Sequence, residues 1–380
     1  MTLSPHRTTS SADEPLKRTE TMTVSTSTVQ PPRAAPSTRS ADSRLVSVLK
    51  AREISVLVPL IVLIVAFYFV NSNFLSSQNI STVLRASAFV GIIAVGQTIL
   101  MLAGEFDLSV GSVAALSGTV CAYGLHDWHW SILPAVLVGL LVGAVAGLIN
   151  GLLTVKVGIA ALIVTLGMLY AARGLTLVIS KGVAIYPLPT SFGNFGQDRI
   201  LGTSWPFIIF VVLALAADFV IRQSLIGSKV LATGGNAQAA RRAGINSDRV
   251  KIACFVFVGV LSGLAGILLV SSIGTADPTM GTGYELQVIA AVFVGGVSLF
   301  GGTGTVLGTV LGLLVIQAIN SGLVFLEVDI NWTNVAVGVL LVIAVSVDVI
   351  RDRQESGGKL RLRALILRRT GIGRSKSMAG

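Results

Sequence analysis

The chain has 380 residues, of which 53% are hydrophobic and only 12% are charged. Soluble domains carry about 25% charged residues, so this composition excludes an ordinary soluble enzyme and indicates a protein with many membrane spans. The formal net charge is +10, and its placement along the chain favours a role in membrane topology over nucleic-acid binding.

The N-terminal segment, residues 1–43, is rich in Ser, Thr and Pro. Such a segment cannot bury enough apolar surface to fold alone, so we expect a disordered tail. Residues 44–53 (RLVSVLKARE) predict a short amphipathic helix lying on the membrane surface.

Ten apolar runs follow, and their lengths predict an all-α integral membrane domain over residues 54–350. The boundaries of the second, third, eighth and ninth runs are crowded with glycine, and the stretch Gly104–Gly111 is compatible with a re-entrant segment. The predicted spans are 54–70, 86–102, 110–125, 131–149, 158–179, 205–221, 252–273, 287–300, 304–324 and 332–350.

Lys and Arg residues are distributed unevenly between the two sides that these spans define. If the N-terminus is cytoplasmic, 24 of the 28 basic residues fall on the cytoplasmic side, including those of the loop 222–251 and of the basic tail 351–380. The positive-inside rule therefore predicts that both termini are cytoplasmic and that the basic segments lie near anionic lipid.

The loop 222–251 contains the polar stretch LATGGNAQAARRAGI, residues 231–245. Asn236 is predicted to be the N-cap of a helix, and Gly244 to be the left-handed residue that ends it. Gly234 and Gly235 are expected to allow a sharp turn into it. The prediction is a two-turn helix presenting Arg241 and Arg242 to the cytoplasm, either as a plain surface loop or as a docking element for a soluble partner.

Several polar residues fall inside or beside the spans, where an unpaired ionisable group is costly. Asp107 is predicted to be either a hydrogen-bond acceptor that lines a cavity or a cap for the helix that follows Ser109. A pair between Asp107 and Arg173 is a further hypothesis. Asn150 is expected to bond across the bundle or to end its own helix, and Thr165 to face the pathway or to bond its own backbone.

Four motifs, in order over roughly residues 80–350, resemble the monosaccharide permeases of ATP-binding-cassette importers, such as those for ribose, galactose, xylose and arabinose. The first is DLSVGS at 107–112, and the second is GLING at 147–151, with TLG at 165–167 and RGL at 173–175. The third is the 234–245 loop, with Gly234-Gly235-Asn236, Ala239-Ala240 and Gly244-Ile245. The fourth is GYEL at 283–286, with the glycine-rich run 295–304.

The resemblance implies a ten-helix bundle of the cobalamin-importer type (type II), in a bacterial inner or plasma membrane. It implies a second permease copy, a cytoplasmic ATPase subunit and an extracytoplasmic sugar-binding protein as partners. It assigns Gly234, Gly235, Asn236, Ala239, Ala240, Arg241 and Gly244 to the loop that couples to the ATPase. The candidates for the translocation pathway are Asp107, Ser109, Asn150, Thr165 and Arg173.

The sequence has no Walker A pattern, because its one Gly-Lys pair, Gly358-Lys359, is followed by Leu360. We therefore expect no enzymatic site, metal or cofactor in this chain, with ATP used by the partner subunit. The alternative hypothesis is an ion-coupled secondary transporter, for which Glu105 or Asp107 would supply the coupling carboxylate. A membrane scaffold that recruits partners through its basic tails is a third hypothesis.

Overall fold

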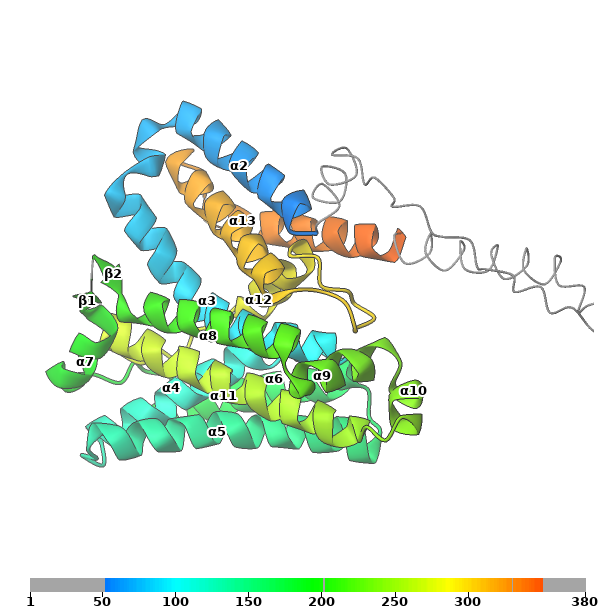
Figure 1. Cartoon of the computed structure of the whole chain (residues 1–380). Coiled ribbons are helices and arrows are strands. Elements are labelled where there is room, and N and C mark those ends of the chain that lie inside the picture. Colours follow the sequence, from blue (N-terminus) through cyan, green and yellow to red (C-terminus); the bar gives the residue numbers. More distant parts are fainter. Residues whose placement is uncertain (1–51, 201, 330, 351–380) are drawn as a thin grey trace, which may run out of the picture. The chain divides into compact units, whose positions relative to one another are not determined.

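The structure is a computed structural model that describes residues 52–200, 202–329 and 331–350, all within one compact unit, Val46–Gly380. The tails predicted at 1–43 and 351–380, and all but the end of the predicted surface helix 44–53, lie outside the described residues. The described part is mostly helical (Figure 1).

Helices with short connections make up the membrane bundle (Figure 1). In chain order they are α2 (Arg52–Val70), η1 (Ser72–Leu75), α3 (Ser77–Leu102), α4 (Val110–His126), α5 (Ile132–Leu152), the π-helical turn η2 (Leu153–Val157), α6 (Ala161–Ser180), α7 (Thr190–Gln197), the hairpin strands β1 (Arg199–Ile200) and β2 (Thr203–Ser204), α8 (Trp205–Gln223), α9 (Leu225–Gly235), α10 (Ala237–Arg242), α11 (Ser247–Ile273), α12 (Tyr284–Val294), α13 (Val306–Phe325) and the helix Trp332–Ile350.

Each of the ten predicted spans falls on one of these helices. Seven of the described helices are long and apolar enough to cross a membrane, while α12 and the apolar part of α2 are shorter. The eighth span was predicted to continue to residue 300, but α12 ends at Val294. The reason is local: Gly296, Gly301 and Gly302 have positive φ, so this part of the chain forms tight turns instead of a helix.

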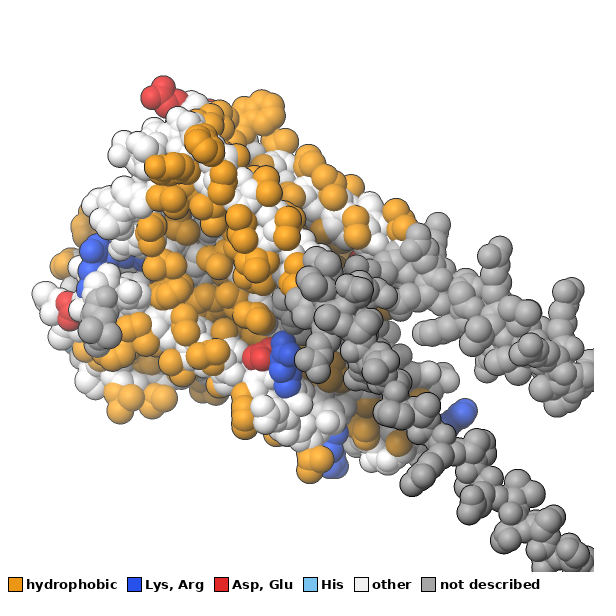
Figure 2. Space-filling model, turned by 45° about the horizontal axis from the view of Figure 1, so that its top comes forward, with side chains coloured by type: hydrophobic (Ala, Val, Ile, Leu, Met, Phe, Trp, Pro, Cys, Tyr) orange, Lys and Arg blue, Asp and Glu red, His pale blue; other side chains and the backbone are white. Residues whose placement is uncertain are grey.

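Helices α3 and α11 form the centre of the bundle. Their most apolar 18-residue windows are 72% and 67% buried, compared with 22% for α6 and 6% for the helix Trp332–Ile350. The outer helices therefore present apolar side chains outward, and Figure 2 shows a face on which such side chains dominate. This is the arrangement expected of a protein surrounded by lipid.

Small residues set the spacing between α11 and its neighbours α4 and α5. A Cβ added at Gly143 of α5 would collide with the carbonyl oxygen of Gly259, and one added at Gly266 would collide with that of Ala114. Because the side chains are absent, the backbones of these helices approach directly, as is common between membrane helices.

The two ends of the bundle are named here by the short helices that lie there. Helix α11 begins beside α10 at the end called the α10 face, and it finishes at the end called the α7 face, where Ser271 donates a hydrogen bond of 2.6 Å to the carbonyl of Phe192 in α7 (Figure 1). Between α3 and α4 the segment 103–109 is not helical, and it leads from the α10 face into the bundle.

Candidate functional site

The segment 225–246 at the α10 face contains α9 and α10. For α10, the sequence correctly predicts the residues at both ends of the helix. Asn236 caps α10, because its Oδ1 accepts from the backbone N–H of Ala239 at 2.9 Å. Gly244 has φ +84° and follows the C-cap residue Ala243, as predicted for the left-handed residue just beyond a helix end. Helix α10 ends at Arg242, and Ala240 is its one buried residue.

The predicted role of Gly234 and Gly235 as turn residues is wrong. Both are the last residues of helix α9, and neither has a positive φ. Gly234 is instead a packing residue: an added Cβ would collide with the carbonyl oxygen of Leu102 and would lie 2.7 Å from the Gly302 nitrogen. The adjacent Gly235 is exposed, and an added Cβ there would meet nothing within 4 Å.

Three chain segments meet at Gly234 with almost no side chains between them. They are the end of α3 with Gly104, the end of α9, and the turn at Gly301-Gly302; we call this contact the glycine junction. Gly302 donates a backbone hydrogen bond of 2.9 Å to Leu102, and a Cβ at Gly301 would lie 2.7 Å from the Gly104 Cα. The junction connects the short helices of the α10 face directly to the central helix α3.

Asp348, in the last turns of the helix Trp332–Ile350, holds the segment that forms the junction. Its Oδ2 accepts from the Leu299 N–H at 2.9 Å and from the Ser298 hydroxyl at 3.2 Å. The sequence did not predict this contact, because it joins residues that lie 50 positions apart. The one signal in the sequence was a carboxylate near the end of the apolar run 332–350, in a chain that also has a glycine-rich run at 295–304.

Asp248, in the first turn of α11, collects two cations at the α10 face. Arg241 of α10 lies 2.5 Å from its Oδ1, and Lys156 of η2 lies 3.0 Å from its Oδ2. Both cations are more than half exposed, so each bond is individually weak. Together they connect α10 and the turn after α5 to α11.

Glu105 forms the second ion pair that connects α11 to a loop. Its Oε1 lies 2.6 Å from Lys251 Nζ, and both side chains are about one-fifth exposed. The pair fixes the non-helical segment 103–109 to the start of α11. The sequence identified Glu105 as a candidate coupling carboxylate for a secondary transporter and did not predict its pairing with Lys251.

Asp107 lies inside the bundle with 2% of its surface exposed. Its Oδ1 accepts from the Ser109 N–H at 2.7 Å and from the Ser109 hydroxyl at 2.6 Å, and its Oδ2 accepts from Asn150 Nδ2 at 3.0 Å. Asn150 also donates to the Ser109 hydroxyl at 3.0 Å. Asp107 thus supports the start of α4, and Asn150 bonds across the bundle while its own helix continues to Leu152.

The other two pathway candidates, Thr165 and Arg173, form hydrogen bonds to backbone carbonyls away from Asp107. Thr165 donates to the carbonyl of Ala161, one turn earlier in α6, at 2.8 Å. Arg173 donates through Nη1 to the carbonyls of Pro278 and Met280, at 3.0 and 2.9 Å, so it holds the loop after α11. The hypothesis of an Asp107–Arg173 pair is therefore wrong, because each side chain has other partners.

No group of three or more His, Cys, Asp or Glu side chains suited to a metal ion occurs among the described residues. The two cysteines, Cys121 and Cys254, are buried and unlinked.

The fold and these contacts define a polytopic helical membrane protein with a loop structure exposed at one end. Residues 79–345 match the family of the permease component of branched-chain amino acid transport systems, and the chain belongs to this family.

Among curated proteins, the chain is 38% identical to the ribose import permease protein of Escherichia coli strain K12, with 77% of this chain and 92% of that protein covered. It is 40% identical to the ribose import permease protein of Bacillus subtilis, with 76% and 90% covered. It is 34% identical to an L-arabinose transporter permease of Azospirillum brasilense, with 76% and 85% covered. No solved structure matches the chain significantly.

Proposed function

We propose that this chain is the membrane-spanning subunit of an ATP-binding-cassette importer and that it carries a monosaccharide into the cytoplasm. The observation that carries the proposal is the similarity to ribose import permeases over nearly their whole length. The family description names branched-chain amino acids, but the curated relatives described above are ribose and L-arabinose permeases, which favours a sugar.

The α10 face is the cytoplasmic face in this proposal. It carries Arg241 and Arg242 on α10 as well as Lys156 and Lys251, in keeping with the positive-inside rule. All ten predicted spans then cross the membrane in an arrangement of the cobalamin-importer type, and two copies of the chain form the pathway between them.

Helix α10 is the proposed docking element for a separate ATPase subunit. It has six residues, too few to be stable alone, and it is held by the Asn236 cap, by Asp248 and, through α9, by the glycine junction. ATP binding and hydrolysis in the partner would move α10, and the junction would pass this movement to α3. This chain would bind no ATP itself, and the sugar would arrive from an extracytoplasmic binding protein.

We propose that the five pathway candidates act on translocation indirectly, by holding neighbouring segments in place. They are Asp107, Ser109, Asn150, Thr165 and Arg173. The contacts of the first three favour an indirect role, in which their hydrogen bonds hold the segment 103–109 in place beside the pathway. Thr165 and Arg173 would likewise shape the pathway by fixing helix α6 and the loop 278–280.

The adjacent glycines Gly234 and Gly235 provide a matched test of the docking role. Gly235→Trp places a large side chain in open space beside α10 and should abolish both uptake and co-purification of the ATPase, while the protein keeps its thermal stability. Gly235→Ala is the control and should behave as the wild type, because the added Cβ has room. Normal uptake by Gly235→Trp would exclude docking at this site.

Gly234→Ala tests the junction itself. The added methyl group collides with the backbone of Leu102, so the expected result is weak coupling: ATPase activity in the assembled complex that no longer responds to the binding protein, together with a lower melting temperature. A Gly234→Ala protein with wild-type melting temperature and wild-type coupling would show that the junction transmits nothing.

The secondary-transporter alternative needs a carboxylate that can take up and release an ion. Glu105 is paired with Lys251, and Asp107 accepts three hydrogen bonds, so both candidates have a structural role. Uptake that stops on addition of a proton uncoupler, while ATP is held high, would favour that alternative over the importer.

A further inference from the structure

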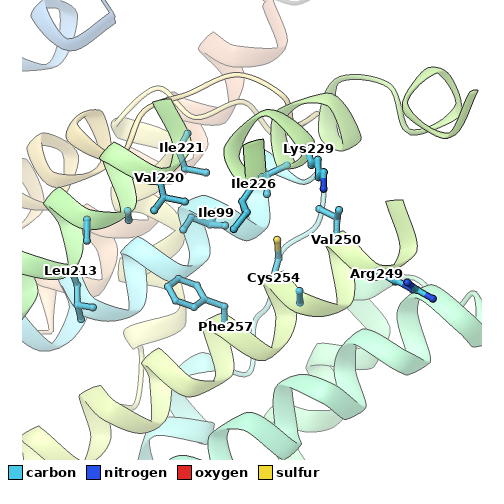
Figure 3. Close-up of a pocket in the computed structure, with 14 residues that line it drawn as sticks. Ile99, Leu213, Val220, Ile221, Ile226, Lys229, Arg249, Val250, Cys254 and Phe257 are labelled. Atoms are coloured by element: carbon cyan, nitrogen blue, oxygen red, sulfur yellow. The ribbon is translucent and has the colours of Figure 1, made fainter. Parts of the chain in front are cut away.

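A groove with a volume of about 550 Å³ lies between α3, α8, α9 and α11 (Figure 3). This volume is within the range of small-molecule sites. Its wall is apolar except at one end, where two cations lie. The lining residues are Ile99, Leu213, Ala216, Ala217, Val220, Ile221, Ile226, Lys229, Val230, Arg249, Val250, Ala253, Cys254 and Phe257.

The groove runs along the axes of two helices. On α8 its wall extends from Ile221 back to Leu213, and on α11 from Arg249 to Phe257. Each wall covers eight residue steps, or ~12 Å at 1.5 Å per residue. One leaflet of a membrane has a hydrocarbon thickness of about 15 Å, so the groove has the length and direction of a lipid chain that starts at the α10 face.

The two cations lie at the end of the groove beside the α10 face. Lys229 comes from α9 and Arg249 from the first turn of α11. In Figure 3 the Lys229 amine lies above Val250, whereas the Arg249 side chain points away from the groove, beyond that end. Both side chains are exposed, and within the described residues neither forms an ion pair with a carboxylate, unlike Lys156 and Lys251 nearby.

The rim of the groove at this end is also suited to a membrane surface. Ile226 lines the groove and is 65% exposed, and its neighbour Leu225 is 81% exposed, although both belong to a short helix at the end of the bundle. Two bare aliphatic side chains beside unpaired cations are typical of a helix that lies at the level of lipid headgroups.

We propose that this groove binds an anionic phospholipid. One acyl chain fills the apolar part between α8 and α11, and the phosphate lies at the end, between Lys229 and Arg249. The site is in the leaflet at the α10 face, and naming that leaflet cytoplasmic rests on the proposed function. A sugar would find almost no hydrogen-bonding partner in this wall, so the groove is distinct from a sugar pathway.

The proposal explains why the two basic residues lie where they do. A basic residue near the membrane favours anionic over neutral lipid by about fivefold, and two acting together favour it by roughly thirtyfold. Each buried methylene of the chain adds to binding without regard to the headgroup. Selectivity for charge should therefore come from Lys229 and Arg249, and retention from the groove wall.

The test uses the full chain in nanodiscs made of phosphatidylcholine with a small fraction of a photoreactive lipid, which carries a diazirine near the end of one acyl chain. Two probes are compared, phosphatidylglycerol and phosphatidylcholine. The expected result is preferential cross-linking of the phosphatidylglycerol probe to peptides that contain Leu213 and Phe257, the residues at the deep end.

The double variant Lys229→Gln/Arg249→Gln should reduce the preference for the phosphatidylglycerol probe by about thirtyfold, with the phosphatidylcholine signal unchanged. Arg242→Gln removes a cation of the same face outside the groove and is the matched control, which should keep the preference. Ala253→Phe fills the groove and should reduce cross-linking of both probes at these peptides.

Equal labelling by the two probes, or a preference that survives the double variant, would overturn the proposal. A photoreactive amino acid placed at Phe257 that cross-links to a second copy of the chain would overturn it as well, because protein would then cover the groove. The assay needs neither ATPase nor sugar, so its outcome is independent of whether the chain imports a monosaccharide.

Discussion

Asp107 and Asp248 are both aspartates that hold a chain segment to the bundle, and they do so by opposite means. Asp107 is buried and is satisfied by short, neutral donors from Ser109 and Asn150. Asp248 is near the surface and is satisfied by two long cations, Arg241 and Lys156. The first arrangement is rigid, because a donor that moved away would leave the buried carboxyl group without a hydrogen-bond partner.

The second arrangement can break and reform at little cost, because water replaces either cation. It lies where α10 is proposed to move, whereas the rigid one lies at the start of α4 inside the bundle. The difference suggests that this fold uses neutral hydrogen bonds where position must be kept and exposed ion pairs where movement is required.

The largest expected effect comes from removing the buried carboxylate. Asp107→Ala leaves the Ser109 hydroxyl and backbone N–H without their acceptor and removes one of the two acceptors of the Asn150 amide, so it should lower the free energy of unfolding by about 3 kcal/mol. The measurement is a refolding titration in mixed detergent micelles. Asp127→Ala, in an exposed turn, should change it by less than about 0.5 kcal/mol, and an equal loss in both variants would contradict the rigid role.

The Glu105–Lys251 pair is intermediate in burial and should be intermediate in effect. A double-mutant cycle with Glu105→Gln and Lys251→Met should give a coupling energy of about 1 kcal/mol, because the pair is only about one-fifth exposed but still screened. A coupling energy indistinguishable from zero would show that the Glu105–Lys251 pair contributes no more to stability than an exposed ion pair.

Removing the charge of Asp248 should have a small effect on global stability. Asp248→Asn is expected to cost about 0.5 kcal/mol, while amide hydrogen exchange of residues 239–242 in α10 becomes faster. High salt should produce the same faster exchange in the wild type. If exchange in α10 is unchanged, Asp248 does not restrain this helix.

The smallest expected effect concerns Asp277, in the exposed loop after α11. Hydrogen bonds from the Thr279 hydroxyl and the Thr279 N–H hold the pKa of Asp277 below its ordinary value. A lowered pKa in the folded state stabilises the protein above the unfolded-state pKa, and this stabilisation disappears as the pH falls through the folded-state pKa.

The stability difference between wild type and Asp277→Ala should therefore be a few tenths of a kcal/mol at pH 7 and close to zero at pH 2. Thermal unfolding at the two pH values measures it. A difference that is the same at both values would show that the Asp277 carboxylate contributes nothing through its charge.

Local features of the site were predictable from the sequence because they depend on neighbouring residues. The Asn236 cap, the left-handed Gly244 just beyond α10 and the positions of most helices follow from capping chemistry and apolar run length. The family resemblance was predictable as well, since it rests on motifs in fixed order.

Contacts between distant residues were not predictable in this way. The Asp348 bond to Leu299, the pairing of Glu105 with Lys251 and the packing of Gly234 against Leu102 join segments far apart in the chain. The error at Gly234 has the same origin: glycine serves both for unusual backbone angles and for close approach, and only the position of the neighbouring segment distinguishes the two.

The hydrogen bond from Gly302 to Leu102 also constrains how the protein is made. The Leu102 carbonyl leaves the ribosome long before its donor: at 5–20 residues per second, residue 302 is synthesised roughly 10–40 s later. During that interval the end of α3 lacks the partner that it has in the finished protein. We therefore expect the early helices to stay associated with the insertion machinery until residue 302 has been made. A chain truncated before the turn 301–302 should be recognised by quality-control proteases.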